Sequence, residues 1–170
     1  MIYMTHYDSP IGKILLATKN EQLIGLWFED QKYCPPFFKE EVKEENTKIL
    51  SQTKEWLDRY FNKGIPLVSE IPFNLTGSDF KIAVLKKLLE IPYGKTTTYK
   101  ALATEIAYEF GLKKMSAQAI GGAIKHNPLS IIIPCHRVIG TNGNLVGYAG
   151  GLERKKYLLE LEGANDANNS

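Results

Sequence analysis

An apolar run from Ile131 to Ile133 ends at Pro134 and leads directly into Cys135 and His136. No other feature of the sequence constrains the fold as strongly. Such a run is typical of a buried strand or extended segment, and the proline that closes it fixes the direction in which the chain leaves. We therefore predict that the Cys135 thiol is held in a rigid position at the end of a buried segment.

The residues around Cys135 favour a reactive thiol. A thiolate is the strongest nucleophile that a side chain offers near neutral pH, and a neighbouring His136 or Arg137 cation favours the thiolate over the thiol. A single cysteine after an aliphatic run is also often an inert small hydrophobic residue. The glycine-rich stretch 140–151 that follows brings backbone close to whatever occupies the site. This context favours chemistry at Cys135.

The first part of the chain, residues 1–75, predicts a small α/β domain. Short runs rich in Ile, Leu and Tyr, separated by turn residues, predict three antiparallel strands at residues 2–7, 12–18 and 22–28. Residues 34–38 predict a loop, and apolar residues at helical spacing predict a helix within residues 44–62. Residues 64–77, with several prolines and glycines, predict a connector that contributes a short strand.

The second part, residues 76–163, predicts a mainly helical domain, and residues 164–170 predict a disordered tail. Ser78 is the expected N-cap of a helix that stops at residues 92–94. A second helix is expected from Tyr99 to residue 111 and a third from about residue 116 to 125. Together they predict a helix-turn-helix arrangement.

The third predicted helix is rich in small residues, which have poor helix propensity. They are Ala117, Ala119, Gly121, Gly122 and Ala123. One interpretation is close packing of this helix against the core. The other is a recognition helix thin enough to approach a nucleic-acid groove.

Charge is unevenly distributed along the chain. The formal net charge is +2, but residues 1–75 hold nine basic and eleven acidic side chains, whereas residues 76–170 hold twelve and eight. A polyanion would be steered to the second half, although such a surplus is equally compatible with an ordinary solvated surface.

Cysteine and histidine usage predicts neither a disulfide nor a metal site. The two cysteines are Cys34 and Cys135, and a reactive thiol has to stay reduced. The three histidines show no metal-binding spacing, so we expect no metal and no cofactor. No apolar stretch approaches the roughly 20 residues of a membrane span, and the N-terminus lacks the pattern of a secretion signal. We expect a soluble, cytoplasmic protein, or a nuclear one if the source is eukaryotic.

Several ordered blocks together resemble the O6-alkylguanine-DNA alkyltransferase family. They are Ile91-Pro-Tyr-Gly94, Thr98-Tyr-Lys-Ala-Leu-Ala103, Ala119-Ile-Gly-Gly-Ala123, Asn127-Pro128, Ile133-Pro-Cys-His-Arg-Val138, Gly147-Tyr-Ala-Gly-Gly151, Leu158-Leu159 and Glu162-Gly163. The resemblance covers nearly all of residues 78–163 and is much weaker before them.

The resemblance implies a fold and a function. It implies a ribonuclease H-like N-terminal domain without a catalytic role and a C-terminal helix-turn-helix, winged-helix-like domain. The implied activity is a single-turnover transfer of the alkyl group from O6-alkylguanine in DNA, with O4-alkylthymine as a further substrate, to Cys135. The implied partner is double-stranded DNA, bound in the minor groove as a monomer with little sequence preference and with the damaged base flipped out.

The resemblance also implies roles for individual residues. Cys135 is the nucleophile, His136 the base, Glu162 the group that holds the histidine tautomer, and Asn127 the residue that fixes the backbone. The expected guanine-pocket residues are Tyr99, Val138, Tyr148, Ala149 and Gly150. The expected DNA contacts are Gln118, Ala119, Gly122, Arg137, Lys100, Lys81 and Thr141.

Several of these residues have simpler explanations in the sequence alone. Glu162 near a helix end is typical of a solvated acid, Asn127 before a proline starts many loops, and Tyr99 at a helix start is usually a core residue. Arg137 is also a candidate for a structural pair with an acid. Gln118 stands where the family usually carries an arginine finger, and the connection at residues 107–115 is longer than usual, with lysines suited to phosphate contacts.

Two functions from other classes remain open at this point. One is a binding protein that flags alkylated bases without transferring the group. The other is a thiol hydrolase that uses Cys135, His136 and Glu162. Adjacent Cys and His side chains usually point apart, which disfavours direct activation for acyl transfer.

Overall fold

The computed structural model describes residues 1–31 and 38–164. These residues form two compact units. The first is Met1–Asn74 together with Pro128–Ile132, and the second is Leu75–Asn127 together with Ile133–Ser170 as far as it is described. Most of the predicted loop at 34–38 and of the predicted tail at 164–170 lies outside the described residues.

The first unit contains a four-stranded sheet, three strands of which form consecutive antiparallel hairpins. Strands β1 (Ile2–Ser9), β2 (Gly12–Lys19) and β3 (Gln22–Phe28) pair in sequence, which confirms the three predicted strands. A short fourth strand, β4 (Val42–Glu44), pairs in parallel with β1 and gives the order β3-β2-β1-β4. The sequence analysis missed β4, because three exposed residues carry no alternating pattern.

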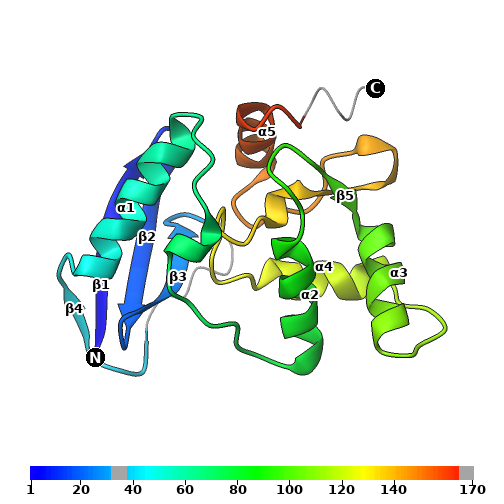
Figure 1. Cartoon of the computed structure of the whole chain (residues 1–170), viewed down its shortest axis with the longest axis horizontal. Coiled ribbons are helices and arrows are strands. Elements are labelled where there is room, and N and C mark those ends of the chain that lie inside the picture. The colour runs from blue at the N-terminus through cyan, green and yellow to red at the C-terminus, as the bar shows by residue number, and fades with distance from the viewer. Residues whose placement is uncertain (32–37, 165–170) are drawn as a thin grey trace. The chain divides into compact units, whose positions relative to one another are not determined.

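Helix α1 (Lys48–Phe61) packs on this sheet, as Figure 1 shows. It begins at Thr47, whose side chain accepts a hydrogen bond from Leu50 N, and it buries Leu50, Trp56, Leu57 and Tyr60. The apolar residues recur at helical spacing, so one stripe of the helix faces the sheet. The predicted helix within 44–62 is confirmed with a later start.

The connector at residues 64–77 differs from the prediction. It contains a single 3-10 turn, Val68–Glu70, and no strand. The turn is held from α1, because Trp56 Nε1 donates to Leu67 O at 2.8 Å and Arg59 pairs with Glu70 at 2.7 Å. Beyond the turn, Pro72 O accepts from Leu23 N of β3 at 2.8 Å, but no strand forms.

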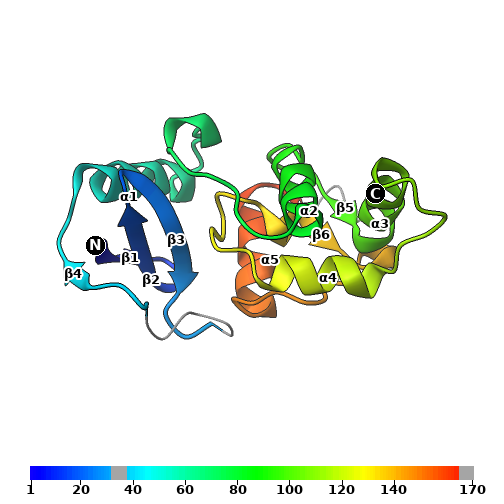
Figure 2. The same cartoon turned by 90° about the horizontal axis from the view of Figure 1, so that it is seen from below.

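The second unit is mainly helical (Figures 1 and 2). Its helices are α2 (Asp79–Leu89), α3 (Tyr99–Glu109), α4 (Ala117–Lys125) and α5 (Leu152–Leu161). Three of them start at a capping side chain, Ser78, Thr98 and Ser116, as expected for residues that satisfy free amide groups. The two-residue strands β5 (Thr97–Thr98) and β6 (Val138–Ile139) pair in parallel.

The run Ile131–Ile133 is buried but is not a strand. All three side chains are at most 1% exposed, yet the backbone turns here and Ile131 has a positive φ of 72°. Leu129, just before the run, forms a bridge with Leu26 of β3, and Ser130 N donates to Leu26 O at 3.1 Å. The prediction of a buried segment is confirmed, whereas that of an extended one is wrong, because apolar content reports burial and not backbone shape.

The end of the described chain is packed against the second unit. Ala164 is fully buried and clusters with Ile139 and Leu159. The predicted tail therefore starts after Ala164 at the earliest. Within the described residues, no helix combines the length and apolar content needed to cross a membrane.

Removing the cap of α4 tests the assignment of its start. Ser116→Ala should lower the free energy of unfolding by about 1 kcal/mol, because Ala119 N then loses its acceptor, Ser116 Oγ at 3.1 Å. Urea denaturation measures this difference. Ser116→Asn retains a capping oxygen and should remain close to the parent; equal losses in both variants would contradict the cap.

Candidate functional site

Cys135 lies in a 3-10 turn, Cys135–Arg137, that follows the buried isoleucine run. Its amide donates to Ile133 O at 2.8 Å, which fixes the backbone at the turn. The thiol is free and only 4% of the residue is exposed. Cys135 nevertheless forms part of the wall of a cavity of about 370 Å³ within the second unit. The thiol is thus shielded from bulk water and accessible from one side.

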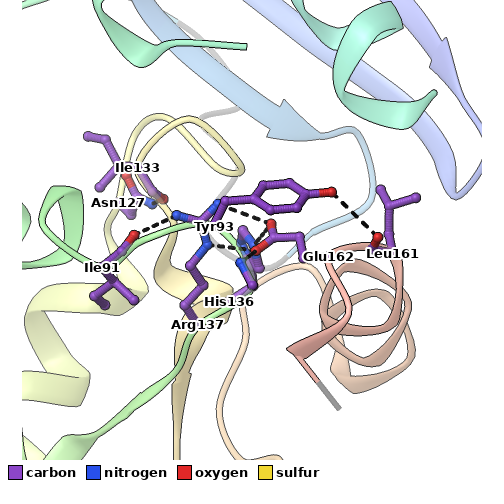
Figure 3. Close-up of polar contacts among 9 residues, drawn as sticks. Ile91, Tyr93, Asn127, Ile133, His136, Arg137, Leu161 and Glu162 are labelled. Atoms are coloured by element: carbon purple, nitrogen blue, oxygen red, sulfur yellow. Dashed lines mark hydrogen bonds and ion pairs between the residues drawn. The ribbon is translucent and has the colours of Figure 1, made fainter. Parts of the chain in front are cut away.

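Behind the thiol, His136 and Glu162 form a buried pair (Figure 3). His136 Nε2 and Glu162 Oε2 are 2.6 Å apart. When Nε2 carries the proton and donates it to the carboxylate, Nδ1 holds a free lone pair. Nδ1 is buried and has no hydrogen-bond partner among the described residues. The geometry therefore leaves His136 one nitrogen that can accept a proton.

Glu162 also holds Arg137, which approaches the same carboxylate from a second direction. Arg137 Nε donates to Oε1 at 2.7 Å and Nη2 to Oε2 at 3.2 Å. Arg137 Nη1 donates to Ile91 O at 2.7 Å. The backbone amide of Gly94 adds a contact with Oε1 at 3.3 Å. The C-cap of α5 is thereby bonded to the turn that carries Cys135.

These contacts set the charges in the site. Burial opposes ionisation of Glu162, but its bonds and charge interactions with His136 and Arg137 outweigh this and hold its pKa well below the usual range. Burial lowers the pKa of His136 despite the favourable contact with Glu162. At neutral pH the site therefore contains a carboxylate and a neutral imidazole, with the charge of Glu162 balanced by Arg137.

Burial also dominates at Cys135. It raises the pKa of the thiol, while a hydrogen bond with Asn127 and the positive charge of Lys155 oppose that rise. Asn127 is itself buried, and its Nδ2 donates to Ile133 O at 2.8 Å. The sequence-based expectation that cations at His136 and Arg137 favour the thiolate is wrong, because His136 is neutral and Arg137 is paired with Glu162.

Tyr99, the first residue of α3, points its hydroxyl at the glycine-rich loop. Its OH donates to Val146 O at 3.1 Å and to Gly147 O at 3.0 Å. Burial and the nearby Cys135 raise the pKa of Tyr99 to about 12, so it remains a donor. Gly147 has a φ of +61°, and an added Cβ would lie 3.3 Å from the Tyr99 OH. The close approach of loop and phenol thus requires glycine here.

The cavity brings together part of the predicted site. Its lining includes the predicted residues Tyr99, Lys100, Gln118, Cys135, Thr141 and Ala149. It also includes Gly140, Val146 and Gly147 from the glycine-rich stretch that was expected to approach the site. The residues that were not predicted to line it are Ala117, Gly121, Ile124 and Lys125. Loop residues such as Val146 carry no chemical signal of their own, so their role follows only from the fold.

Other predicted residues lie outside the cavity lining. Val138 is buried in β6, and Gly150 is buried after the loop. Tyr148 is partly exposed, although its hydroxyl is buried. Lys81 is half-buried on α2, and burial lowers its pKa. Arg137 is bonded to Glu162 and Ile91, which is the structural pairing that the sequence left open.

The small residues of α4 are not explained by close packing alone. The helix buries Ile120 and Ile124, whereas Gln118 and Gly122 are exposed and Ala119 is partly exposed. An added Cβ at Gly122 would meet no atom within 4 Å. The opposite face of α4 therefore presents a low, open surface.

Lys155 is a functional candidate that the sequence analysis missed. It is fully buried on α5, and its Nζ donates to Val146 O at 2.8 Å. A signal was present, because Lys155 precedes Leu158 and Leu159 by three and four residues and so shares their buried face. No group of three or more potential metal ligands is found in the part of the chain that the structure describes.

Replacing the shared carboxylate tests its contribution. Glu162→Gln should lower the free energy of unfolding at pH 7 by about 3 kcal/mol, because Arg137 is left without its counter-charge. Since the folded-state pKa of Glu162 lies below the unfolded value of about 4.3, this stability is complete above that pH and is lost as pH falls. The gap between parent and variant should therefore narrow at pH 3.5, as urea denaturation at both pH values will measure.

The matched control for that prediction is Glu160→Gln. Glu160 is an exposed acid on the same helix, 4.0 Å from Lys156. Its replacement should change stability by less than about 0.5 kcal/mol at either pH. A loss for Glu162→Gln that is small at pH 7, or that grows as the pH is lowered, would contradict the assigned charge state.

Two family models together match most of the chain. The 6-O-methylguanine DNA methyltransferase ribonuclease-like domain matches residues 2–75, and the DNA binding domain of the same name matches residues 79–164. A methylated-DNA--protein-cysteine methyltransferase of Haemophilus influenzae is 37% identical over 95% of this chain and 86% of its own length. The protein of that name from Methanosarcina barkeri is 40% identical over 96% of this chain and 99% of its own.

Solved structures agree with the sequence relatives. The O6-methylguanine methyltransferase of Mycobacterium tuberculosis superposes with a TM-score of 0.79 at 39% identity, covering 96% of this chain and 94% of that one. The OGT of the same organism in complex with DNA gives a TM-score of 0.80 at 36% identity, covering 96% and 92%. With the Cys135, His136 and Glu162 geometry in place, these matches establish that the chain belongs to the 6-O-methylguanine DNA methyltransferase family.

Proposed function

We propose that this protein repairs DNA by direct reversal, taking the alkyl group from O6 of guanine onto Cys135 in a single turnover. The observation that carries the proposal is the thiol itself. Cys135 forms part of the cavity wall, and the neighbouring His136 is held by Glu162 with one nitrogen free. Membership of the methyltransferase family supports the same chemistry.

The transfer proceeds as an in-line displacement. The Cys135 proton passes to His136 Nδ1 through a water molecule, because adjacent side chains diverge. The thiolate then attacks the alkyl carbon, so that an S–C bond forms and the C–O6 bond breaks. Guanine leaves as an anion and takes up the thiol proton, which His136 returns through the water molecule, so that the normal base is restored. The product on the protein is a thioether that water and thiols do not readily cleave. Each molecule therefore acts once.

Tyr99 assists the leaving group. Its hydroxyl, now bonded to Val146 O and Gly147 O, exchanges these carbonyls for the guanine ring nitrogen when the base enters. A phenol with a pKa of about 12 stays protonated and can donate throughout. The hydrogen bond strengthens as negative charge develops on the base, which favours the transition state over the bound substrate.

DNA binds through the exposed face of α4 in this proposal. Gln118 takes the place of the usual arginine finger and bonds the orphaned pyrimidine, while Ala119 and Gly122 allow close approach to the minor groove. Lys100 and Thr141 at the cavity edge supply phosphate contacts. Arg137 can contact a phosphate only if its bonds to Glu162 break. Lys81 contacts a phosphate from a half-buried position. The protein binds as a monomer.

The remaining predicted roles are also part of the proposal. Residues 1–75 have no catalytic function, and the guanine pocket includes the backbone of Val138 and the segment Tyr148–Gly150. The reaction requires a free thiol, so the protein works in a reducing compartment such as the cytoplasm. O4-alkylthymine is a second substrate of the same geometry.

The alternative functions receive less support. A flagging protein without transfer has no use for a nucleophile, whereas Cys135 stands in the cavity. A thiol hydrolase needs direct activation and donors for an oxyanion. In this site the Asn127 side chain is bonded to Ile133 O and to Cys135 itself, and the Tyr99 hydroxyl donates to loop carbonyls. The alkyl transfer needs only the thiol, a proton acceptor such as His136, and a hydrogen-bond donor to the guanine ring nitrogen.

Intact mass measurement tests the reaction directly. Incubation with duplex containing O6-methylguanine should add one methylene to the protein mass, and peptide mapping should locate the gain on Cys135. Cys135→Ser should take up no methyl group, whereas Cys34→Ser should react like the parent. Methyl removal by Cys135→Ser at the parental rate would refute the proposal, and release of methyl groups over many turnovers would favour a hydrolytic mechanism.

A charge placed on the open face of α4 tests the DNA surface. Gly122→Glu should weaken binding to duplex by about tenfold, because a carboxylate would face the phosphates. Fluorescence anisotropy measures the affinity.

Gly122→Ala is the steric control for this variant. It should leave binding nearly unchanged and raise the free energy of unfolding by about 0.5 kcal/mol, since alanine favours helix. Parental affinity in Gly122→Glu would place the DNA elsewhere.

A further inference from the structure

Lys155 is a buried cation inside the active-site region for which the proposed reaction has so far assigned no role. It lies in the middle of α5 and is 0% exposed. Its Nζ donates to Val146 O at 2.8 Å and lies 3.5 Å from Gly147 O, and it stands 5.7 Å from the centre of the Tyr99 ring. An ammonium group in such surroundings is costly unless something uses its charge.

Among the described residues, no carboxylate forms an ion pair with Lys155. Its hydrogen bonds go to backbone carbonyls, which are neutral. This contrasts with Arg137, whose charge is matched by Glu162 at the C-cap of α5. Within the described part of the second unit, Arg137 is thus a partly buried cation with an acidic partner, whereas Lys155 is a fully buried cation that contacts backbone dipoles and an aromatic face.

The titratable groups that interact with Lys155 come from two elements. Cys135 and His136 belong to the 3-10 turn, and Tyr99 belongs to α3. His136 is neutral at pH 7, and Tyr99 remains a phenol. Cys135 is the only one of these three that becomes an anion during the proposed reaction. The positive charge of Lys155 favours that anion, and a negative Cys135 in turn favours the ammonium.

We propose that Lys155 is a positioning residue for alkyl transfer, which holds the Val146–Gly147 wall of the pocket and supplies the counter-charge for the Cys135 thiolate. This inference rests on the proposed function. When the Cys135 proton moves to His136, the sulfur becomes negative beside an ammonium that is already in place. No rearrangement is needed at that moment, so the field of Lys155 acts on the attacking atom before the S–C bond forms.

The lysine charge is available under physiological conditions. Burial lowers the pKa of Lys155 to about 8, while Cys135 opposes this shift. Below that pH the amine is protonated and the counter-charge is present. The same two carbonyls accept from Tyr99, so Lys155 also holds the loop against which the phenol rests.

The test measures the thiol without DNA. The rate of Cys135 alkylation by iodoacetamide, in which sulfur displaces iodide from carbon, is followed against pH by peptide mapping in a Cys34→Ser background. Lys155→Met removes both the charge and the hydrogen bonds, whereas Lys155→Gln removes the charge and keeps a donor for Val146 O. In both variants the rate at pH 7.5, where the parental Lys155 is protonated, should be about tenfold below that of the parent. The difference should shrink above about pH 8, as the parental amine loses its proton.

Lys156→Met is the matched control. Lys156 is the next residue on α5, its side chain is 63% exposed, and it lies 4.0 Å from Glu160. Its replacement should leave the pH profile unchanged. Circular dichroism verifies the folding of every variant, and Lys155→Gln carries the test if Lys155→Met does not fold. A folded Lys155→Gln that reacts at the parental rate at pH 7.5 would overturn the counter-charge role.

The outcome is separable from that of the proposed function. Methyl transfer from DNA is measured in parallel by intact mass. If the parent takes no methyl group but its alkylation rate at pH 7.5 depends on Lys155, alkyl transfer fails and the electrostatic coupling stands. If the parent takes the methyl group and Lys155→Gln reacts with iodoacetamide at the parental rate at pH 7.5, the proposed function stands and this inference fails.

Discussion

The arrangement of the active site depends on one carboxylate. Glu162, at the C-terminal end of α5, accepts hydrogen bonds from Arg137 and is paired with His136. His136 and Arg137 are neighbours in the 3-10 turn that begins at Cys135. Arg137 continues to Ile91 O, so the chain after α2 is tied to the same centre. Because the partners are buried, each lost bond would leave a polar group without water to replace it. The turn that carries Cys135 is therefore fixed by the residues that follow the cysteine.

Burial shifts the pKa values of the two proposed reacting groups in opposite directions, and both shifts favour the neutral forms. It raises the pKa of the Cys135 thiol, so the resting protein keeps the thiol protonated. It lowers the pKa of His136, so the imidazole is neutral at rest and its protonation during the reaction has to be supported by Glu162. A solvent-exposed thiol would ionise more easily but would also react with oxidants and small electrophiles. The buried site thus protects the thiol from unwanted reactions, while Asn127 and Lys155 offset part of the free-energy cost of ionising Cys135.

Much of the fold followed from local sequence signals. The strands β1 to β3 alternate with clear turns, and Ser78 and Ser116 mark helix starts in the way their chemistry requires. The three-residue strand β4 depends on β1 as a partner, and the turn at Ile131 depends on its surroundings. Neither has a local signal, so neither was predicted.

The candidate site shows the same limit. Cys135 and His136 stood out by their types and neighbours, whereas the pairing of Arg137 depends on an acid 25 residues later in the sequence. Lysine is usually a surface residue, and only the position of Lys155 one turn before Leu158 and Leu159 indicates that it is buried. Candidate reactive residues can thus be identified from the sequence, but their charge states can be inferred only from the packed structure.

The hydroxyl of Tyr99 has a consequence for the search along DNA. In the resting protein it already donates to two loop carbonyls, so an empty pocket contains no unsatisfied phenol. In the proposed reaction, the Tyr99 hydroxyl gives up these carbonyls when a nucleobase enters and donates to the nucleobase instead. The net gain in free energy from the new hydrogen bond is therefore small. The Tyr99 contact therefore adds little to the retention of an undamaged guanine. This favours the release of normal bases, so that a single molecule can survey many sites before it is spent on one lesion.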